Sequence, residues 1–278
     1  MPKQNSTMTS GQEASRQRPA GTVKIIDSHC HLDFPAFDRD RDAVLDACRR
    51  AGIELVVVPG VKAASWDRLL EVTGAHDAMM IPALGLHPMF LDSHGDDDLD
   101  RLRRYIARHR PYAVGEVGLD YHLRDLDRGR QCFFFEAQLE IAGQSGLPVI
   151  LHVRKAHDEV LGFLRRARVP GGIVHAFNGS LQQAGQYLDL GFKLGFGGAV
   201  TYPRAKRLRR LAQQLPLHAI VLETDAPDMA PASRRGRRNS PACLPEVLDT
   251  LTGLRRESRV VIAEQTRRNT HRVFGLAR

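Results

Sequence analysis

Six side chains of this 278-residue sequence have the types and the spacing that bound metal ions require. Four are histidines and two are carboxylates, and they follow or close short apolar runs; they are His29, His31, Glu116, His152, His175 and Asp225. Imidazole and carboxylate groups together suit zinc, manganese or iron, and also magnesium where water completes the coordination shell. The sequence therefore indicates metal-assisted chemistry.

The histidines His29 and His31 lie two residues apart at the end of an apolar run. Side chains two apart on a strand face the same way, so both rings can point into one site. A single His-x-His pair also occurs as hydrogen-bonded core or surface residues. Here Asp27 and Asp33 flank the pair with carboxylates that suit orienting or local structural roles, which favours the interpretation as ligands.

Glu116 belongs to the apolar run 113–117, where an unpaired charge would be costly, so a cation is expected beside it. His152, His175 and Asp225 lie at the ends of three further apolar runs. Taken singly, each histidine is better explained as a hydrogen-bonded core group. Their common position at strand ends, where barrel enzymes place catalytic groups, makes one joint site the better interpretation.

Six ligands exceed what one tetrahedral ion requires, so we expect two divalent ions per chain, with Glu116 bridging them. Their identity stays open among magnesium, manganese and zinc. Two ions about 3.5–4 Å apart can activate a water and stabilise the leaving oxygen of a phosphodiester. Asp225 is expected to bind one ion and accept the proton of that water, so Asp225 and Glu116 are the predicted catalytic residues.

An alternation of short apolar runs and helical patterns must position these residues. The eight runs are 24–27, 55–59, 79–84, 113–117, 149–153, 172–177, 192–196 and 220–223. Segments of helical period lie between them, and two more, 245–254 and 260–274, close the chain. Eight strands separated by helices predict an α/β fold, a closed (β/α)8 TIM barrel, in preference to an open sheet.

The composition is that of a globular protein, with 42% apolar and 26% charged residues. Residues 1–22 hold few large apolar side chains and are expected to form a flexible tail before a single domain, 23–278. The sequence has no apolar run long enough for a membrane span and no signal-peptide core, so a cytoplasmic protein is expected. Its four widely spaced cysteines predict free thiols. We expect a monomer without an obligate protein partner.

The net charge of +8 is concentrated in two arginine-rich segments, 204–210 and 234–238. Such segments are usually solvated faces. The second follows the last predicted strand and so lies near the predicted site, which favours a polyanionic substrate.

The order and spacing of these motifs resemble the TatD family of metal-dependent hydrolases, from Ile25 to Phe274. The resemblance implies a TIM barrel of the metal-dependent hydrolase, amidohydrolase-like type. The matching motifs are Asp27-Ser-His29-Cys-His31-Leu-Asp33, Gly85-Leu-His87-Pro88, Gly115-Glu116-Val-Gly118-Leu-Asp120, His152-Val-Arg154, His175-Ala-Phe177-Asn-Gly179 and Glu223-Thr-Asp225-Ala-Pro227. The stretches that begin at Ser180 and Leu222 are most similar to the YjjV branch of that family.

The resemblance implies a role for each candidate. His29, His31 and Asp225 would bind one ion and His152 and His175 the other, with Glu116 between them. It also implies a deoxyribonuclease that trims DNA from the 3′ end.

Three further residues are expected to contact substrate: His87, Arg154 and Asn239. Packing or surface ion pairing explains the first two equally well. Two other functions remain open, hydrolysis of another ester or amide, such as an aminoacyl-RNA ester, and non-catalytic nucleic-acid binding.

Overall fold

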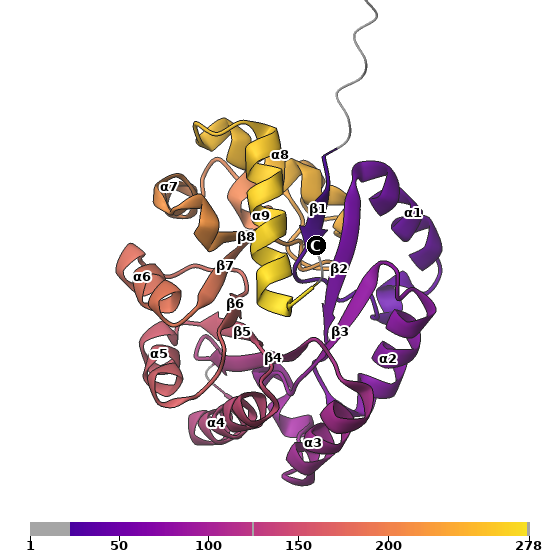
Figure 1. Ribbon diagram of the computed structural model, residues 1–278, viewed down its shortest axis with the longest axis vertical. Coiled ribbons are helices and arrows are strands. Elements are labelled where there is room, and N and C mark those ends of the chain that lie inside the picture. The colour runs from indigo at the N-terminus through magenta and orange to yellow at the C-terminus, as the bar shows by residue number, and fades with distance from the viewer. Residues whose placement is uncertain (1–22, 124, 277–278) are drawn as a thin grey trace, which may run out of the picture.

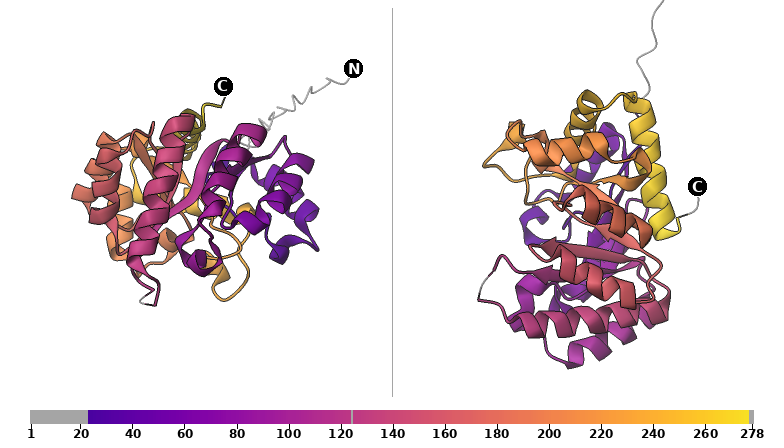
Figure 2. Two further views of the ribbon diagram at one scale, coloured as in Figure 1. Left: turned by 90° about the horizontal axis from the view of Figure 1, so that it is seen from below. Right: turned by 90° about the vertical axis from the view of Figure 1, so that its left-hand side faces the viewer.

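A computed structural model describes residues 23–123 and 125–276; the predicted tail, residues 1–22, lies outside the described residues. Eight parallel strands follow one another around a barrel in the order β1 to β8, and helices surround them (Figures 1 and 2). The strands are β1 Ile25–Asp27, β2 Ile53–Pro59, β3 Met80–Leu84, β4 Ala113–Asp120, β5 Val149–Arg154, β6 Gly172–Val174, β7 Phe192–Phe196 and β8 Ile220–Leu222. The predicted (β/α)8 fold is confirmed.

Helices connect successive strands, and two follow the last strand. They are α1 Arg41–Ala51, α2 Trp66–Ala75, α3 Asp97–His109, α4 Arg128–Ser145, α5 His157–Arg166, α6 Leu181–Asp189, α7 Lys206–Gln214, α8 Leu244–Leu254 and α9 Arg259–Phe274. Gly52 and Gly146 end α1 and α4 in the left-handed conformation, with φ of 85° and 64°, which glycine adopts without steric cost.

Two strands end three residues away from the ends that the apolar runs indicate. The sixth strand stops at Val174, because Ala176 has a φ of 44° and breaks the extended conformation. His175 nevertheless stays anchored, since its N–H donates to Leu151 O at 3.0 Å. The fourth strand continues to Asp120, since residues 118–120 pair with 152–154 of β5.

Hydrogen bonds between β1 and β8 close the barrel. The Ser28 N–H donates to Leu222 O at 2.9 Å. Beyond the strands, the His31 N–H donates to Ala226 O and the Asp225 N–H to His29 O, at 2.8 and 2.9 Å. The first and last strands thus hold their chemically important side chains in one fixed arrangement.

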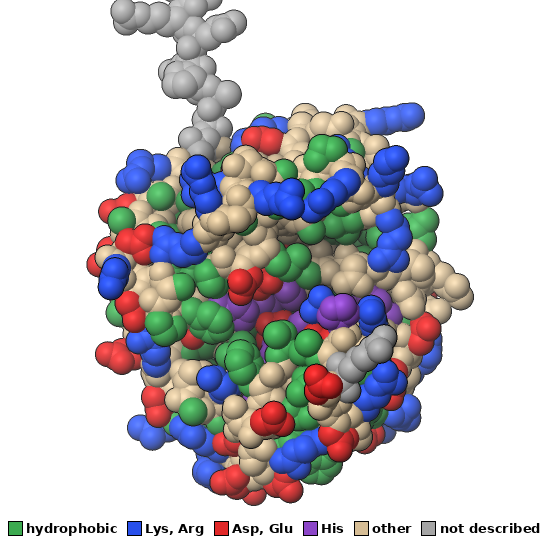
Figure 3. Space-filling view, turned by 180° about the vertical axis from the view of Figure 1, so that it is seen from behind, with side chains coloured by type: hydrophobic (Ala, Val, Ile, Leu, Met, Phe, Trp, Pro, Cys, Tyr) green, Lys and Arg blue, Asp and Glu red, His purple; other side chains and the backbone are tan. Residues whose placement is uncertain are grey.

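One end of the barrel interior is filled. Side chains from β2, β3, β4, β5, β6 and β8 form a buried cluster with Phe274 of α9, and they are Val57, Ile81, Ala83, Ala113, Ile150, Ile173 and Val221. Helix α9 crosses this end (Figure 1). The histidines appear in a hollow on the opposite side (Figure 3), where the strands have their carboxyl ends. Along the described segments, every helix is too short or too polar to cross a membrane.

Candidate metal centre

A cavity of about 510 Å³ opens at the carboxyl ends of the strands. Its floor is polar, with His31, Glu116, His152, His175 and Asp225 among the lining residues. Its walls are largely apolar and include Phe34, Phe90, Phe177 and Phe196. Five of the six predicted ligands therefore line one pocket, and the sixth, His29, lies fully buried directly behind them.

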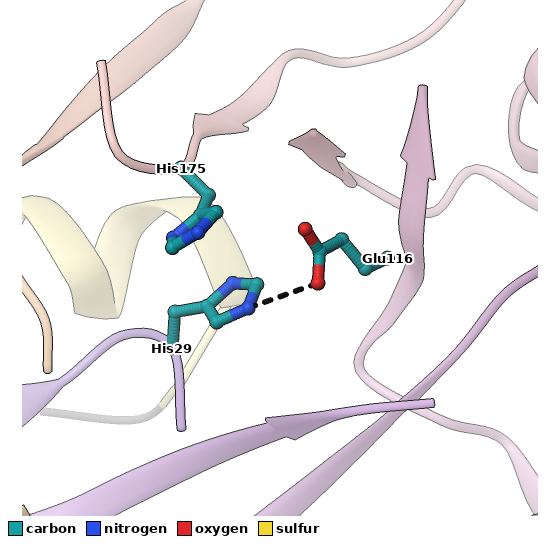
Figure 4. Close-up of side chains that lie close together, drawn as sticks. All are labelled: His29, Glu116 and His175. Atoms are coloured by element: carbon teal, nitrogen blue, oxygen red, sulfur yellow. Dashed lines mark ion pairs between the residues drawn. The ribbon is translucent and has the colours of Figure 1, made fainter. Parts of the chain in front are cut away.

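One ligand set combines the first and last strands. The Nε2 atoms of His29 and His31 are 3.3 Å apart, and each lies 3.6 Å from Oδ1 of Asp225. Glu116 faces the same point, with Oε2 at 3.1 Å from Nε2 of His29 (Figure 4). The structure therefore brings these four predicted side chains together at one point.

A second group of histidines faces the other carboxylate oxygen of Glu116. Oε1 lies 3.0 Å from Nδ1 of His152 and 3.1 Å from Nε2 of His87. Nδ1 of His87 accepts the N–H of Met89, so Nε2 of His87 bears the ring proton and donates to Glu116. The carboxylate of Glu116 therefore lies between two groups of imidazoles, as a bridging ligand would.

His175 approaches from a third direction. Its ring stacks on that of His29 at 3.7 Å, and Nε2 lies 3.6 Å from Oδ2 of Asp225. Within the described residues, the ligand sets are His29–Glu116–His175, His29–His31–Asp225 and His87–Glu116–His152. None of these sets joins His152 to His175, which differs from the pairing that the resemblance implies.

Two carboxylates behind the histidines received no role from the sequence. Oε1 of Glu223 lies 3.1 Å from Nδ1 of His175 and accepts the Ala176 N–H at 2.7 Å. Asp120 lies 3.1 Å from Nε2 of His152. Carboxylates in this position fix the orientation of ligand imidazoles. Both belong to the family-like motifs, but only the fold shows which ring each one contacts.

Gly195 provides the space for Glu223. A Cβ atom at this glycine would lie 2.1 Å from Oε2 of Glu223. The absence of a side chain on β7 therefore allows a buried carboxylate to reach His175.

Three non-glycine residues in the left-handed region lie at or beside the chemically important strand ends. Asp225 has a φ of 57°, Ala176 follows His175 with 44°, and Lys155 follows Arg154 with 56°. Such conformations cost about 1–3 kcal/mol each and concentrate at functional sites. The surrounding hydrogen bonds, including that from the Asp225 N–H, maintain this geometry.

The pKa values reflect strong coupling between buried groups. Burial opposes ionisation of Asp225, but His175, His29 and His31 outweigh it and lower its pKa to about 2. Burial likewise opposes protonation of His31, but the hydrogen bond and charge of Glu116 and the charge of Asp225 raise its pKa to about 9. For His87, burial dominates and lowers the pKa to about 4.

The donor set fits bound cations. Charged carboxylates in this buried centre require compensating positive charge, which protonated imidazoles supply here and which a divalent ion would supply with the rings neutral. The buried Nδ1 of His29 has no hydrogen-bond partner among the described residues. Nitrogen and oxygen donors in this mixture suit zinc and manganese in particular.

The three expected substrate contacts occupy different environments. Arg154 lines the cavity with 46% of its side chain exposed. His87 is only 5% exposed and contacts Glu116. Asn239 is fully buried beneath the loop after β8 and does not line the cavity, because its amide group donates to Thr224 O and Asp228 O and accepts the Ser240 N–H. It holds the loop in place.

Known proteins resemble this chain over nearly its whole length. Residues 26–275 match the family model described as TatD related DNase. The metal-dependent hydrolase YjjV of Escherichia coli K12 is 40% identical over 256 residues, covering 91% of this chain and 98% of YjjV. Its crystal structure superimposes with a TM-score of 0.88 and 39% identity over 92% of this chain and 100% of that chain.

A more distant relative has a more specific name. The protein named 3'-5' ssDNA/RNA exonuclease TatD from Pantoea ananatis is 30% identical over 259 residues, which is 91% of this chain and 100% of the relative. The chain therefore belongs to the TatD family of metal-dependent hydrolases.

Proposed function

We propose that this protein is a nuclease that hydrolyses phosphodiester bonds at the 3′ ends of DNA with two divalent ions. The observation that carries the proposal is the position of Glu116, whose two oxygens face separate groups of histidines at 3.0–3.1 Å. The name of the Pantoea ananatis relative supports a nucleic-acid substrate. Magnesium, manganese and zinc are the candidate ions.

The ligands of the first ion follow from the convergent side chains, and those of the second follow from the resemblance to the TatD family. His29, His31 and Asp225 would hold one ion, Glu116 would bridge, and His152 and His175 would hold the other. When bound, such ions supply Lewis-acid activation of water and of phosphate oxygens. The ring of His87, which donates to Glu116, would fix the orientation of that carboxylate.

Asp225 and Arg154 would act on the substrate directly. Asp225 is 16% exposed at the cavity floor, where its carboxylate can accept a proton from the attacking water. Arg154 presents a planar set of donors that can bind a non-bridging phosphate oxygen. The aromatic walls can contact the terminal base and sugar.

The test is hydrolysis of end-labelled DNA by metal-stripped protein, with magnesium, manganese, zinc or no metal added. We expect metal-dependent shortening from the 3′ end, and its loss in Asp225→Ala. Asp189→Ala is the matched control, because Asp189 is exposed at the end of α6.

Shortening by Asp225→Ala at the wild-type rate would contradict the role of this residue. No cleavage with any metal would contradict the proposed nuclease and favour another ester or amide, such as an aminoacyl-RNA ester.

A further inference from the structure

A second pocket adjoins the metal centre. It has a volume of about 690 Å³ and shares Ala199, Asp228 and Met229 with the first cavity. Its remaining wall includes Tyr202, Arg204 and Arg237. A substrate longer than the first cavity can therefore continue directly into the second, over the shared residues.

The second pocket has unpaired positive charge. Arg204 and Arg237 are both exposed, and neither forms an ion pair within 4.0 Å with any carboxylate of the described residues. Among the described residues that line the pocket, only Asp228 is acidic. The pocket thus has an excess of positive charge that suits an anionic group.

Neighbouring arginines are engaged in the fold. Arg238 forms a two-pronged ion pair with Asp40, at 2.6 and 2.9 Å, and its guanidinium lies over the ring of Phe37. Arg209 donates to Val200 O at 2.9 Å, and Arg207 donates to Asn178 O. Only part of the arginine-rich sequence is therefore free to bind a ligand.

The wall between the two pockets is held in a defined position. Met229 lines both cavities, has a φ of 48° and is 40% exposed. The hydroxyl of Tyr202 donates to Ala230 O at 3.0 Å and ties the Met229 loop to the segment after β7. The guanidinium of Arg204 lies 5.5 Å from the centre of the Tyr202 ring, which orients it beside the pocket.

We infer that this second pocket binds the phosphate of the nucleotide adjoining the one that is cleaved, between Arg204 and Arg237. This inference rests on the proposed nuclease function and adds a subsite to it. Figure 3 shows the basic side chains along the rim above the histidines, where a strand leaving the metal centre would run. The pocket gives affinity for a strand over a single nucleotide, without reading its sequence, because phosphate carries no base information.

The test is equilibrium binding of fluorescent oligothymidylates to the metal-loaded protein. Phosphorothioate linkages keep the charge of each phosphate and resist cleavage. We compare a dinucleotide with a tetranucleotide, each labelled at the 5′ end, by fluorescence anisotropy over a range of salt concentrations. The wild-type protein is expected to bind the tetranucleotide more tightly, with a steeper salt dependence.

Arg204→Ser/Arg237→Ser should remove most of this gain in affinity. The slope of log K against log salt for the tetranucleotide should become shallower by about 0.7–1.4, for one or two lost contacts with a single strand. Arg50→Ser/Arg108→Ser is the matched control, since it removes the same charge from the ends of α1 and α3 at the opposite end of the barrel.

The inference is overturned if the double variant keeps the wild-type gain and slope, or if it loses no more than the control. Arg204→Lys/Arg237→Lys checks the result, because it should retain the salt slope of the wild-type protein. The binding measurement does not depend on cleavage, so it tests the subsite even if the nuclease assay shows no hydrolysis. Conversely, equal affinity for both oligonucleotides together with efficient cleavage of DNA would overturn the inferred subsite without contradicting the proposed nuclease function.

Discussion

Replacement of Glu223 by glutamine tests whether this buried carboxylate strengthens metal binding through His175. The side chain is 1% exposed, and Oε1 faces both His175 Nδ1 and the Ala176 N–H, at 3.1 and 2.7 Å. Glutamine has the same shape, so its carbonyl can still accept the Ala176 N–H. Its amide would occupy the position of Oε2, which has no partner among the described residues and abuts Gly195. The substitution therefore removes mainly the negative charge beside His175.

The expected loss follows from that charge. Carboxylates behind ligand histidines contribute 10–100-fold to metal affinity or activity. This range corresponds to about 1.4–2.8 kcal/mol of binding free energy. We expect Glu223→Gln to weaken metal binding by that factor. The melting temperature of the metal-free protein should fall less than that of the metal-loaded protein, because the contact with the Ala176 N–H is preserved.

Competition with a chromophoric chelator gives the metal affinity, and thermal unfolding of the stripped protein gives the stability. Glu71→Gln is the control, since Glu71 is exposed on α2 and makes no hydrogen bond or ion pair in the described structure. Wild-type metal affinity in Glu223→Gln would refute the argument that this carboxylate orients His175. A large fall in metal-free stability would instead show that its role is in the fold.

Three further outcomes are expected. Asn239→Ala should lower the unfolding free energy by about 1–3 kcal/mol, because the buried carbonyl of Thr224 and the partly buried carbonyl of Asp228 lose their donor; an unchanged urea midpoint would contradict this. Saturation of stripped protein with metal at 100 times Kd should add about 2.7 kcal/mol, or about 5–10 °C in Tm, and an unaltered melting curve would argue against a folded-state site. Burial lowers the pKa of His157 from 6.5, so the unfolded chain binds the proton more tightly and stability should fall as pH drops below 6.5. His157→Gln should reduce this slope in urea titrations between pH 5 and 7; equal slopes would show that other groups cause it.

The strands and the converging ligands could be predicted because both depend on local patterns. Apolar runs define the strands, and side chains two apart share a face, so His29 and His31 were expected to point together. Glu116 was expected to need a cation because it lies in an apolar run. These inferences need only the sequence near each residue and the general form of a barrel.

The partners of the ligands depend on distances that a single sequence does not contain. Glu223 contacts a histidine 48 positions earlier in the chain, and it does so only because Gly195 leaves space for it. The burial of Asn239 depends on the path of the loop after β8. Arg238 lies in a basic segment like its neighbours, yet its contact with Asp40 is visible only in three dimensions.

The closure of the barrel between β1 and β8 also determines when during synthesis the metal centre can form. His29 and Asp225 come from opposite ends of the chain, and Asp27 accepts hydrogen bonds from Thr224 across the same seam. A nascent chain that has not yet emerged through β8 lacks one carboxylate ligand and the backbone contacts that orient the first two histidines. The site can therefore assemble only after β8 and the segment that carries Asp225 have left the ribosome, and a nascent chain that ends before them lacks the assembled site.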